Sequence, residues 1–289
     1  MEIRRIDLHM HSTASDGTDD PAALVQLVRQ AGIPVFSVTN HDTVQACDQL
    51  MELTRDAGPV WVAGVELSCR DEEGKYHILG YGYDPKAEPL RRVIGELQAC
   101  RLEKLQARLA FLRESLGIVF PAEETDALVR LPNPGKPHIA ALLVRHGYAD
   151  TVGEAIRRYL RQLPDIRRHV SPEEAIRAIR ESGGIAALAH PVFGDGSQLI
   201  SGGALAHRVR RLTGFGLQGL EGYYSGYDRA QRAQVLALAE ALHLYVTAGS
   251  DYHGANKTVA LGNTGLPDAD AIPEGLTRFF EALGLDLPI

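Results

Sequence analysis

The sequence contains few cysteines and no long apolar run. Three cysteines among 289 residues, an odd number without a CxxC spacing, argue against a disulfide framework and fit a reducing compartment. No apolar run reaches the roughly 18 residues that a membrane-spanning helix needs. The N-terminus passes from Met1 directly into Glu2, Arg4 and Arg5, without an apolar leader. We therefore expect a cytoplasmic protein with no membrane partner.

The sequence also lacks an excess of positive charge. Its net charge of −7 and pI near 5.9 argue against a broadly basic surface, although they allow a local basic patch. We therefore expect no long nucleic acid as a partner, and no feature indicates an obligate protein partner. The 45% hydrophobic and 23% charged content is that of a soluble globular protein. The length suits one α/β domain of barrel size or one domain with an insertion.

Eleven histidines are the first bias in what the sequence does contain. His9 and His11 are separated by one residue, directly after a short apolar start. Side chains alternate between the two faces of a strand, so these imidazoles are expected to project the same way. Two imidazoles on one face can hold one metal ion.

Short apolar runs alternate with helical patterns over most of the chain. A helix is predicted after the N-cap Asp20, and another after the N-cap Ser171 with Glu174 as its capping-box partner. The alternation is typical of a mostly parallel α/β sheet or barrel. Strands are predicted at residues 3–11, 35–38, 60–65, 76–83, 185–189, 217–222 and 245–248.

The pattern changes between residues 87 and 165. Residues 90–116 are charged and helical, with a leucine-rich stripe, and shorter helical segments follow. We predict a helical insertion over 87–165, acting as a lid or substrate-specificity domain, within a metal-binding domain formed by 1–86 and 166–289.

Metal-competent side chains lie at or just past the ends of the predicted strands, with His77 inside its strand and Asp16 in the first loop as two further candidates. Carboxyl ends of parallel strands meet at one rim, so residues distant in sequence are expected to converge there. Nine ligands exceed the four to six of a single ion, which indicates two or three divalent ions, most simply Mn²⁺, with Zn²⁺, Fe²⁺ or Mg²⁺ as alternatives. The candidate ligands are His9, His11, Asp16, His41, Glu66, His77, His190, Asp251 and His253.

These motifs carry a family resemblance. The segments 7–12, 39–42, 64–67, 189–191 and 249–253 resemble, in order, the metal motifs of the polymerase and histidinol phosphatase (PHP) family. The resemblance implies a distorted (β/α)₇ TIM-like barrel. It also implies one ion on His9, His11, Glu66 and Asp251, a second on Glu66, His77 and His190, and a third on Asp16, His41 and His253. Asp16 stands where some members have a histidine.

The insertion narrows the resemblance. Residues 135–144 resemble the insertion of PHP members that hydrolyse 3′,5′-nucleoside bisphosphates, which are related to enzymes that trim short RNA from the 5′ end. The implied function is hydrolysis of the 3′-phosphate of adenosine 3′,5′-bisphosphate to AMP and phosphate. Residues 161–169 lack the Gly- and Lys-rich composition that is expected in the RNA-trimming relatives.

Candidate substrate-binding residues lie in the insertion and past one strand. Lys136 and His138 lie in a constrained loop and are candidates for binding phosphate. Arg167 and Arg168 form a basic pair, and Tyr223 and Tyr224 could stack on a base or pack in the core. Asp42 is either a helix N-cap or a residue that orients a ligand. The basic residues of the long helix, Arg101, Lys104, Arg108 and Arg113, are interpreted mainly as a solvated face.

The expected mechanism is attack of a metal-bridging hydroxide on the phosphomonoester. Glu66, Asp251 and His253 are the expected catalytic residues, and the sequence does not choose between Asp251 and His253 as the acid for the leaving oxygen. Alternatives on the same site are 5′–3′ exoribonuclease activity on short RNA and histidinol-phosphate hydrolysis. Further alternatives are a non-catalytic metal-stabilised scaffold and metal-dependent amide or ring hydrolysis.

Overall fold

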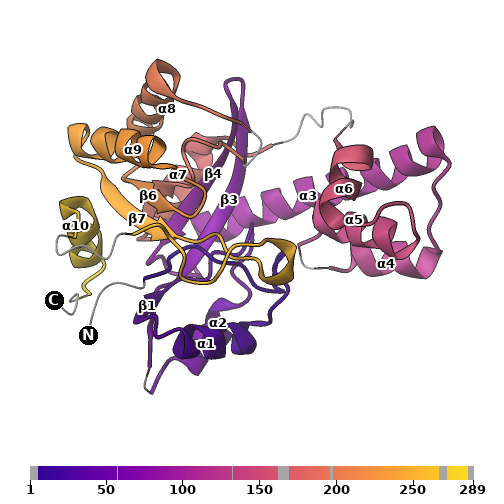
Figure 1. The fold of residues 1–289 in the computed structure, drawn as a ribbon, viewed down its shortest axis with the longest axis horizontal. Coiled ribbons are helices and arrows are strands. Elements are labelled where there is room, and N and C mark those ends of the chain that lie inside the picture. Colours follow the sequence, from indigo (N-terminus) through magenta and orange to yellow (C-terminus); the bar gives the residue numbers. More distant parts are fainter. Residues whose placement is uncertain are drawn as a thin grey trace.

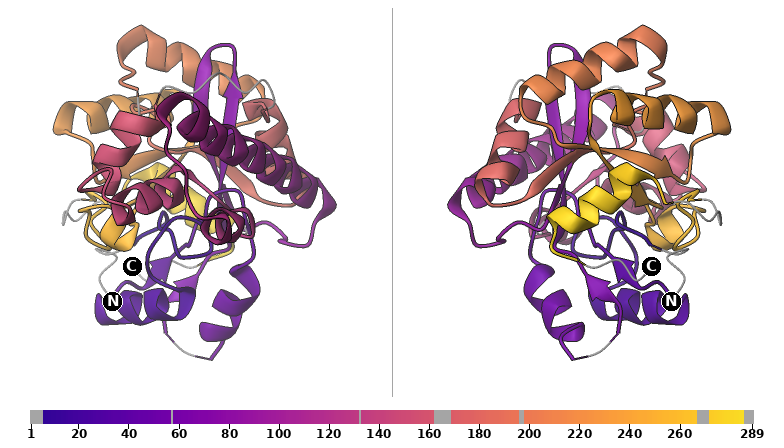
Figure 2. Two further views of the ribbon diagram at one scale, coloured as in Figure 1. Left: turned by 90° about the vertical axis from the view of Figure 1, so that its right-hand side faces the viewer. Right: turned by 90° about the vertical axis from the view of Figure 1, so that its left-hand side faces the viewer.

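The computed structural model describes residues 6–56, 58–131, 133–161, 169–195, 198–266 and 272–285. These residues form a body built around a β-sheet and a helical lobe that extends from one side of it (Figure 1). Figure 2 shows α8 (Gly202–Gly214), α9 (Arg229–Ala241) and α10 (Glu274–Ala282) on the side of the body away from that lobe.

The main sheet has five strands, in the order β3-β4-β5-β6-β7. β3 pairs antiparallel with β4, and β4 antiparallel with β5, whereas the later pairs are parallel. A separate parallel pair joins β1 (Val35–Phe36) and β2 (Val60–Trp61). The strands of the main sheet are β3 (Gly64–Asp71), β4 (Gly74–Tyr81), β5 (Ile185–Leu188), β6 (Gly219–Tyr224) and β7 (Tyr245–Gly249).

The N-terminal segment lies between β7 and β1. The Leu8 N–H donates to the Ala248 carbonyl at 2.9 Å, and the Ser37 N–H donates to the Asp7 carbonyl at 2.9 Å. The predicted strand at 3–11 is nevertheless not regular in its described part, where Asp7 and Met10 form only isolated bridges. The regular pairing gives two sheets with an antiparallel hairpin, a mixed α/β fold, and the closed (β/α)₇ barrel stays a prediction.

Two helices of the body begin at the positions that their capping residues led us to predict. Asp20 accepts hydrogen bonds from the N–H groups of Ala22 and Ala23 and opens α1 (Pro21–Gln30). Ser171 and Glu174 form a capping box that opens α7 (Pro172–Glu181). A capping side chain satisfies N–H groups that have no partner within the helix, which explains why these two starts were readable from sequence. The remaining body helix, α2, spans Cys47–Leu53.

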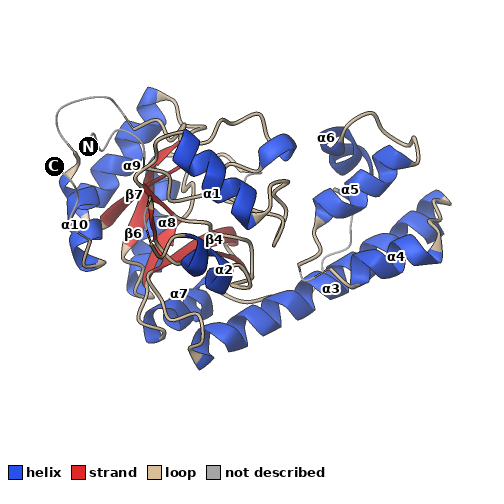
Figure 3. Cartoon of the chain, turned by 90° about the horizontal axis from the view of Figure 1, so that it is seen from below, coloured by secondary structure: helices blue, strands red, loops and turns tan. Residues whose placement is uncertain are grey.

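The helical lobe has its own hydrophobic core. The first half of the long helix α3 (Glu88–Leu116) contributes Leu90, Val93 and Leu97 to the core of the body. From Leu105 onward its buried side chains belong to a second core. The change of core therefore falls inside α3, which joins the two parts as one continuous helix (Figure 3). The boundaries of the insertion at residues 87 and 165 stay a prediction. The lobe also contains α4 (Ala122–Val129), α5 (Lys136–Arg145), α6 (Val152–Ala155) and a π-helix (Ile156–Leu160).

None of the helices in the described ranges combines the length and apolarity required to cross a membrane. The longest of them, α3, carries charged side chains on most of its turns.

Candidate metal centre

All nine candidate ligands converge at one edge of the body. Glu66, expected at the end of a strand, instead lies within β3, and His77 lies within β4 as predicted. These two residues lie close together because β3 and β4 pair side by side as an antiparallel hairpin. The other seven lie outside the helices and regular strands, in loops and extended segments: His9, His11, Asp16, His41, His190, Asp251 and His253.

Glu66 lies at the middle of the cluster. Its carboxylate is 1% exposed, and both oxygens face imidazole nitrogens at 2.8 to 3.2 Å. One oxygen faces three histidines and the other faces two, an arrangement suited to a carboxylate that bridges ions. Oε2 faces His9 Nε2, His11 Nε2 and His41 Nδ1, and Oε1 faces His77 Nδ1 and His190 Nε2.

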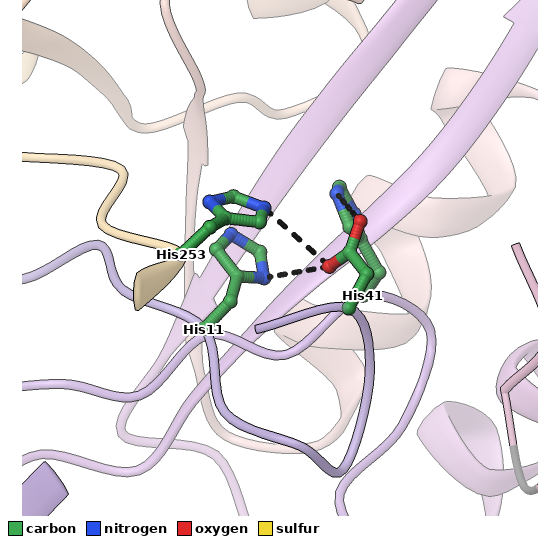
Figure 4. Close-up of side chains that lie close together, drawn as sticks. His11, His41 and His253 are labelled. Carbon is green, nitrogen blue, oxygen red and sulfur yellow. Dashed lines mark ion pairs between the residues drawn. The ribbon is translucent and has the colours of Figure 1, made fainter. Parts of the chain in front are cut away.

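Asp16 gathers three imidazoles at the other end of the cluster. Its Oδ1 lies 3.4 Å from His253 Nε2 and 3.7 Å from His11 Nδ1, and its Oδ2 lies 4.0 Å from His41 Nε2. The rings of His11 and His253 stack at 4.0 Å. Figure 4 shows the imidazoles of His11, His41 and His253 turned toward one another.

The donor atoms form overlapping groups of the size that an ion needs. In each group these atoms lie within 4.8 Å of one another, and together the groups contain every candidate ligand. They share His9, His11, His41 and Glu66, so neighbouring ions would share ligands. The groups are His11–Asp16–His41–His253, His9–His11–Asp251, His9–Glu66–His190 and His41–Glu66–His77.

Unsatisfied buried atoms fit a metal cluster. In the described part of the chain, His9 Nε2, His11 Nε2, His41 Nδ1, His77 Nδ1 and Glu66 Oε2 are buried and make no hydrogen bond. Buried polar atoms are normally hydrogen-bonded, and an orphan group points to an ion or water. Mixed imidazole and carboxylate donors suit Zn²⁺, Mn²⁺ or Fe²⁺. These residues therefore fit divalent metal ions.

The carboxylates of the cluster are held in their charged form. Burial alone would raise the pKa of Glu66, but the imidazoles of His41, His9 and His77 hold its pKa well below the ordinary value. Asp251 behaves alike: burial opposes ionisation, and Lys257 with the nearby histidines lowers its pKa well below the usual range. A buried carboxylate that stays ionised is ready to ligate a cation.

Three residues of the site hold a strained backbone. Asp42, His190 and Asp251 have φ angles of 51°, 29° and 59°. Such left-handed conformations cost roughly 1–3 kcal/mol each in a residue with a Cβ, and they persist only where the surroundings impose them. At His190 the imposing contact is a hydrogen bond of 2.7 Å from its N–H to Glu221 Oε2.

Glu221 is a site residue that the sequence analysis missed. It is fully buried within β6, and its Oε1 lies 2.9 Å from Nδ1 of His9. A carboxylate on the far nitrogen of a metal-ligating histidine fixes its tautomer and orientation. Gly249 makes room for this contact, since a Cβ there would lie 2.2 Å from His9 Cβ and 2.5 Å from Glu221 Oε1. The available signal was an acidic residue inside an otherwise apolar strand.

Lys257 is a second residue that was missed. Its Nζ lies 2.5 Å from Asp251 Oδ2, and the Tyr224 hydroxyl donates to the same oxygen at 3.0 Å. The other oxygen of Asp251 faces His9, His11 and His253 at 3.3 to 3.6 Å. Asp251 thus directs one oxygen toward the metal ligands and is held in place through the other.

A cleft of about 350 Å³ opens beside the cluster, between the body and the lobe. His41, His77 and Asp16 line one end of it. Residues of the body, among them Lys75 and Asp195, line part of the rest. The lobe adds cations, among them three basic residues of α3 that were interpreted from sequence mainly as a solvated face. They are spaced by three and four residues, which places them on one helix face. The cations from the lobe are Arg101, Lys104, Arg108 and Lys136.

The proposed substrate-binding residues have different surroundings. Lys136 lines the cleft at the start of α5, while the His138 ring accepts a hydrogen bond of 2.9 Å from the Gly135 N–H. Tyr223 is 5% exposed and belongs to the main core, so its burial favours packing over base stacking. Tyr224 lies against the His190 ring at 5.4 Å. Arg167 and Arg168 lie outside the described residues.

Comparison with known proteins settles the family. The family model described as the PHP domain matches residues 7–208, a range that contains seven of the nine ligands and the whole lobe. The chain belongs to the PHP family. The N-terminal histidine pair, Glu66 and His190 lie within the matched range.

Three relatives and one solved structure carry related names. A 5′–3′ exoribonuclease of Haemophilus influenzae is 29% identical over 90% of this chain and 93% of its own length. A phosphoribosyl 1,2-cyclic phosphate 1,2-diphosphodiesterase of Eggerthella lenta is 31% identical over 86% and 94%. A 3′,5′-nucleoside bisphosphate phosphatase of Chromobacterium violaceum is 29% identical over 87% and 88%.

The solved structure is a Bifidobacterium adolescentis protein assigned as a metal-dependent phosphoesterase. It superposes with a TM-score of 0.81 at 28% identity, covering 98% of this chain and 97% of that one. Together with the ligand cluster, these similarities identify this PHP protein as a metal-dependent phosphoesterase that hydrolyses phosphate esters.

Proposed function

We propose that this protein removes the 3′-phosphate of 3′,5′-nucleoside bisphosphates, such as adenosine 3′,5′-bisphosphate. The observation that carries the proposal is the cleft in which a metal centre and a group of lobe cations face the same space. A ribose with two phosphates would place one phosphate at each end. The relative from Chromobacterium violaceum bears the name of this activity.

The lobe cations lie close enough to one another to lower each other's pKa. Burial, then Arg108 and Lys75, lowers the pKa of Lys136 to about 8. Burial and the neighbouring Arg101 lower the pKa of Arg108 to about 10. Mutual repulsion of this kind is relieved when an anion enters, so the cleft is built to gain from binding a phosphate. The chain's net charge of −7 shows that this is a local feature.

The cluster residues would act on the phosphate at the other end. His9, His11, His41, His77, His190, His253, Glu66, Asp16 and Asp251 would hold two or three divalent ions. When bound, such ions neutralise charge on the phosphoryl oxygens and activate water as the nucleophile. The Mn²⁺ preference remains part of the proposal.

The protein residues supply orientation and protons. Glu221 holds His9, and Lys257 with Tyr224 holds Asp251. The leaving ribose oxygen needs a proton, for which Asp251 and His253 are the candidates. Burial lowers the pKa of His253, so its ring is neutral near pH 7, and the Asp251 carboxylate is ionised. Either group would therefore first accept a proton from the attacking water and then pass that proton to the leaving oxygen. The lobe cations hold the second phosphate, and this remote binding energy selects bisphosphates.

A second candidate is 5′–3′ trimming of short RNA. It is favoured by the exoribonuclease from Haemophilus influenzae, which matches 90% of this chain. The 1,2-cyclic phosphodiester named for the Eggerthella lenta relative also consists of a phosphorylated ribose with a second phosphoryl group. All three substrates present two phosphoryl groups on or around one ribose, which suits the same two-ended cleft.

The deciding experiment is a phosphate-release and product assay with Mn²⁺ present. Its substrates are adenosine 3′,5′-bisphosphate, short 5′-phosphorylated RNA, phosphoribosyl 1,2-cyclic phosphate, histidinol phosphate and an aryl phosphate. We expect the highest kcat/KM on the bisphosphate, with AMP as product. A higher kcat/KM on RNA, the cyclic diester or histidinol phosphate would replace the proposed substrate.

Lys136→Ala tests the role of the lobe. A charge-assisted hydrogen bond of about 1.5–3 kcal/mol is lost with the ammonium, so kcat/KM on the bisphosphate should fall about 10- to 100-fold. Turnover of the aryl phosphate, which has no second phosphate, should change little. Lys86→Ala, an exposed lysine outside the cleft, is the matched control. Equal losses on the two substrates would contradict the selectivity.

A further inference from the structure

The loop that carries His41 is held by the lobe as well as by the body. On the body side, the Asp42 N–H donates to the Glu66 carbonyl at 2.9 Å, and the Glu66 N–H donates to the Asn40 carbonyl at 3.2 Å. On the lobe side, the Asn133 side-chain amide donates to the His41 carbonyl. The backbone on both sides of this candidate ligand is therefore fixed from two directions.

Asp42 is the main point of contact with the lobe. Its Oδ2 accepts from Arg101 Nε of α3, and its backbone carbonyl accepts from Gln98 Nε2 of the same helix at 3.2 Å. Its Oδ1 accepts from the Ser68 N–H of β3 at 2.7 Å. Arg101 also donates from Nη2 to the Ser68 hydroxyl at 3.0 Å, which closes a ring of contacts between α3, β3 and the loop.

This geometry decides between the two roles considered for Asp42. It caps no helix, because α2 begins at Cys47 with Ala46 as its N-cap. Its side chain is fully buried and its φ is 51°, a strained conformation that only the surrounding contacts can maintain. A buried carboxylate also requires its cation, and Arg101 is the cation that contacts it. The pair therefore determines the path of the backbone next to His41.

His41 is a residue for which such control has consequences. Its Nδ1 faces Glu66 at 3.2 Å, and its Nε2 faces Asp16 at 4.0 Å. It belongs to two of the ligand groups, so a small rotation of its ring changes both. A ligand is useful only when its ring is held in the right orientation by groups outside the metal shell.

We propose that Asp42 and Arg101 are positioning residues through which the lobe fixes His41 as a metal ligand, so that metal affinity at this end of the cluster depends on the lobe. Arg101 and Asp42 both line the cleft as well, so the pair lies between the lobe cations and the ligand His41. The inference rests on the proposed use of the cluster as a metal centre, but not on the identity of the substrate.

The test is a Mn²⁺ titration of metal-depleted protein by equilibrium dialysis, for Arg101→Gln, Asp42→Asn and the double variant. Loss of an outer partner of a metal ligand typically weakens metal binding about 10- to 100-fold. We expect that loss for the ions that His41 would ligate, with an ion held by ligands other than His41 within about threefold of wild type. Because both changes break one connection, the double variant should resemble the more affected single variant instead of adding the two losses.

Arg108→Gln is the matched control. It removes the same charge from the same helix face and the same cleft, seven residues further along α3. We expect it to leave all Mn²⁺ affinities unchanged while weakening the binding of AMP. Asn133→Ala breaks the contact to the His41 carbonyl without changing the charge, and should weaken binding of the same ions as Arg101→Gln.

Two results would overturn the proposal. One is an unchanged Mn²⁺ profile in Arg101→Gln and Asn133→Ala. The other is an equal loss in Arg101→Gln and Arg108→Gln, which would indicate a general charge effect. Thermal unfolding of each metal-depleted variant is measured alongside, to check that the variant retains its fold. Because Mn²⁺ binding is measured without substrate, these results are independent of whether the bisphosphate is hydrolysed.

Discussion

The metal cluster and the phosphate cleft share a boundary but are built in opposite ways. The cluster consists of imidazoles and carboxylates, six of the nine buried, that are held by two strands, by loops and by a strained backbone, and each ligand lies near several others. The cleft is lined on the lobe side by long cationic side chains that project from helices. The positions of the cluster residues are determined by local chain geometry, whereas the positions of the cleft cations are determined by the direction in which α3 leaves the body.

The difference has a consequence for the division of labour between the two regions. Because Glu66 faces five imidazoles, we expect a change at Glu66 to disturb most of the cluster at once. The cleft contains several cations with overlapping roles, so its changes should be graded. We therefore associate the chemistry with the body and the choice of substrate with the lobe.

Glu66→Gln should have the largest effect. The amide cannot supply two anionic oxygens to imidazoles on both sides, and the ions that share this carboxylate would lose it together. We expect at least about a 100-fold loss of phosphate release, above the usual loss from an outer partner, and reduced bound metal by elemental analysis. Glu72→Gln, in the exposed turn between β3 and β4, is the control. Full metal content with full activity in Glu66→Gln would show that Glu66 is not a shared metal ligand.

Glu221→Gln should have an intermediate effect. Glu221 uses one oxygen for His9 Nδ1 and the other for the His190 N–H, and an amide can accept at only one of these. We expect Mn²⁺ affinity to fall about 10- to 100-fold while bound stoichiometry is recovered at higher Mn²⁺ concentration. Glu240→Gln, exposed on α9, should be unchanged. An unaltered Mn²⁺ titration would mean that His9 is oriented by the backbone alone.

The two regions also differ in how much of them could be predicted from the sequence. The ligands were predictable because a metal site needs particular residue types, and because those at strand ends fall into short motifs such as His9-Met10-His11. Helix starts at Asp20 and Ser171 were predictable because capping is local chemistry. These features depend on a few neighbouring residues.

The remaining features depend on contacts between distant segments. Arg101, Lys104 and Arg108 look in sequence like a solvated helix face, and only the path of α3 across the body turns them into a cleft wall. The antiparallel β3–β4 pairing, which places Glu66 inside a strand and close to His77, follows from hairpin formation and not from a parallel βαβ pattern. Lys257 reaches Asp251 through loop geometry that no spacing rule describes.

The smallest predicted effect is the pH dependence of the cleft, which separates it from the cluster. Burial and neighbouring cations lower the pKa of Lys136 to about 8, so its ammonium is present below that pH and is lost above it. Phosphate binding requires the charged form, so KM for the bisphosphate should rise above pH 8, by up to about tenfold at pH 9, where one ammonium in ten remains. KM for the aryl phosphate should show no matching rise, because that substrate does not reach the lobe. Lys136→Arg, whose charge persists to higher pH, should flatten the KM profile of the bisphosphate while leaving the pH dependence that both substrates share. A steep rise that persists in Lys136→Arg would assign the pH dependence to the metal cluster and remove the electrostatic distinction between the two regions.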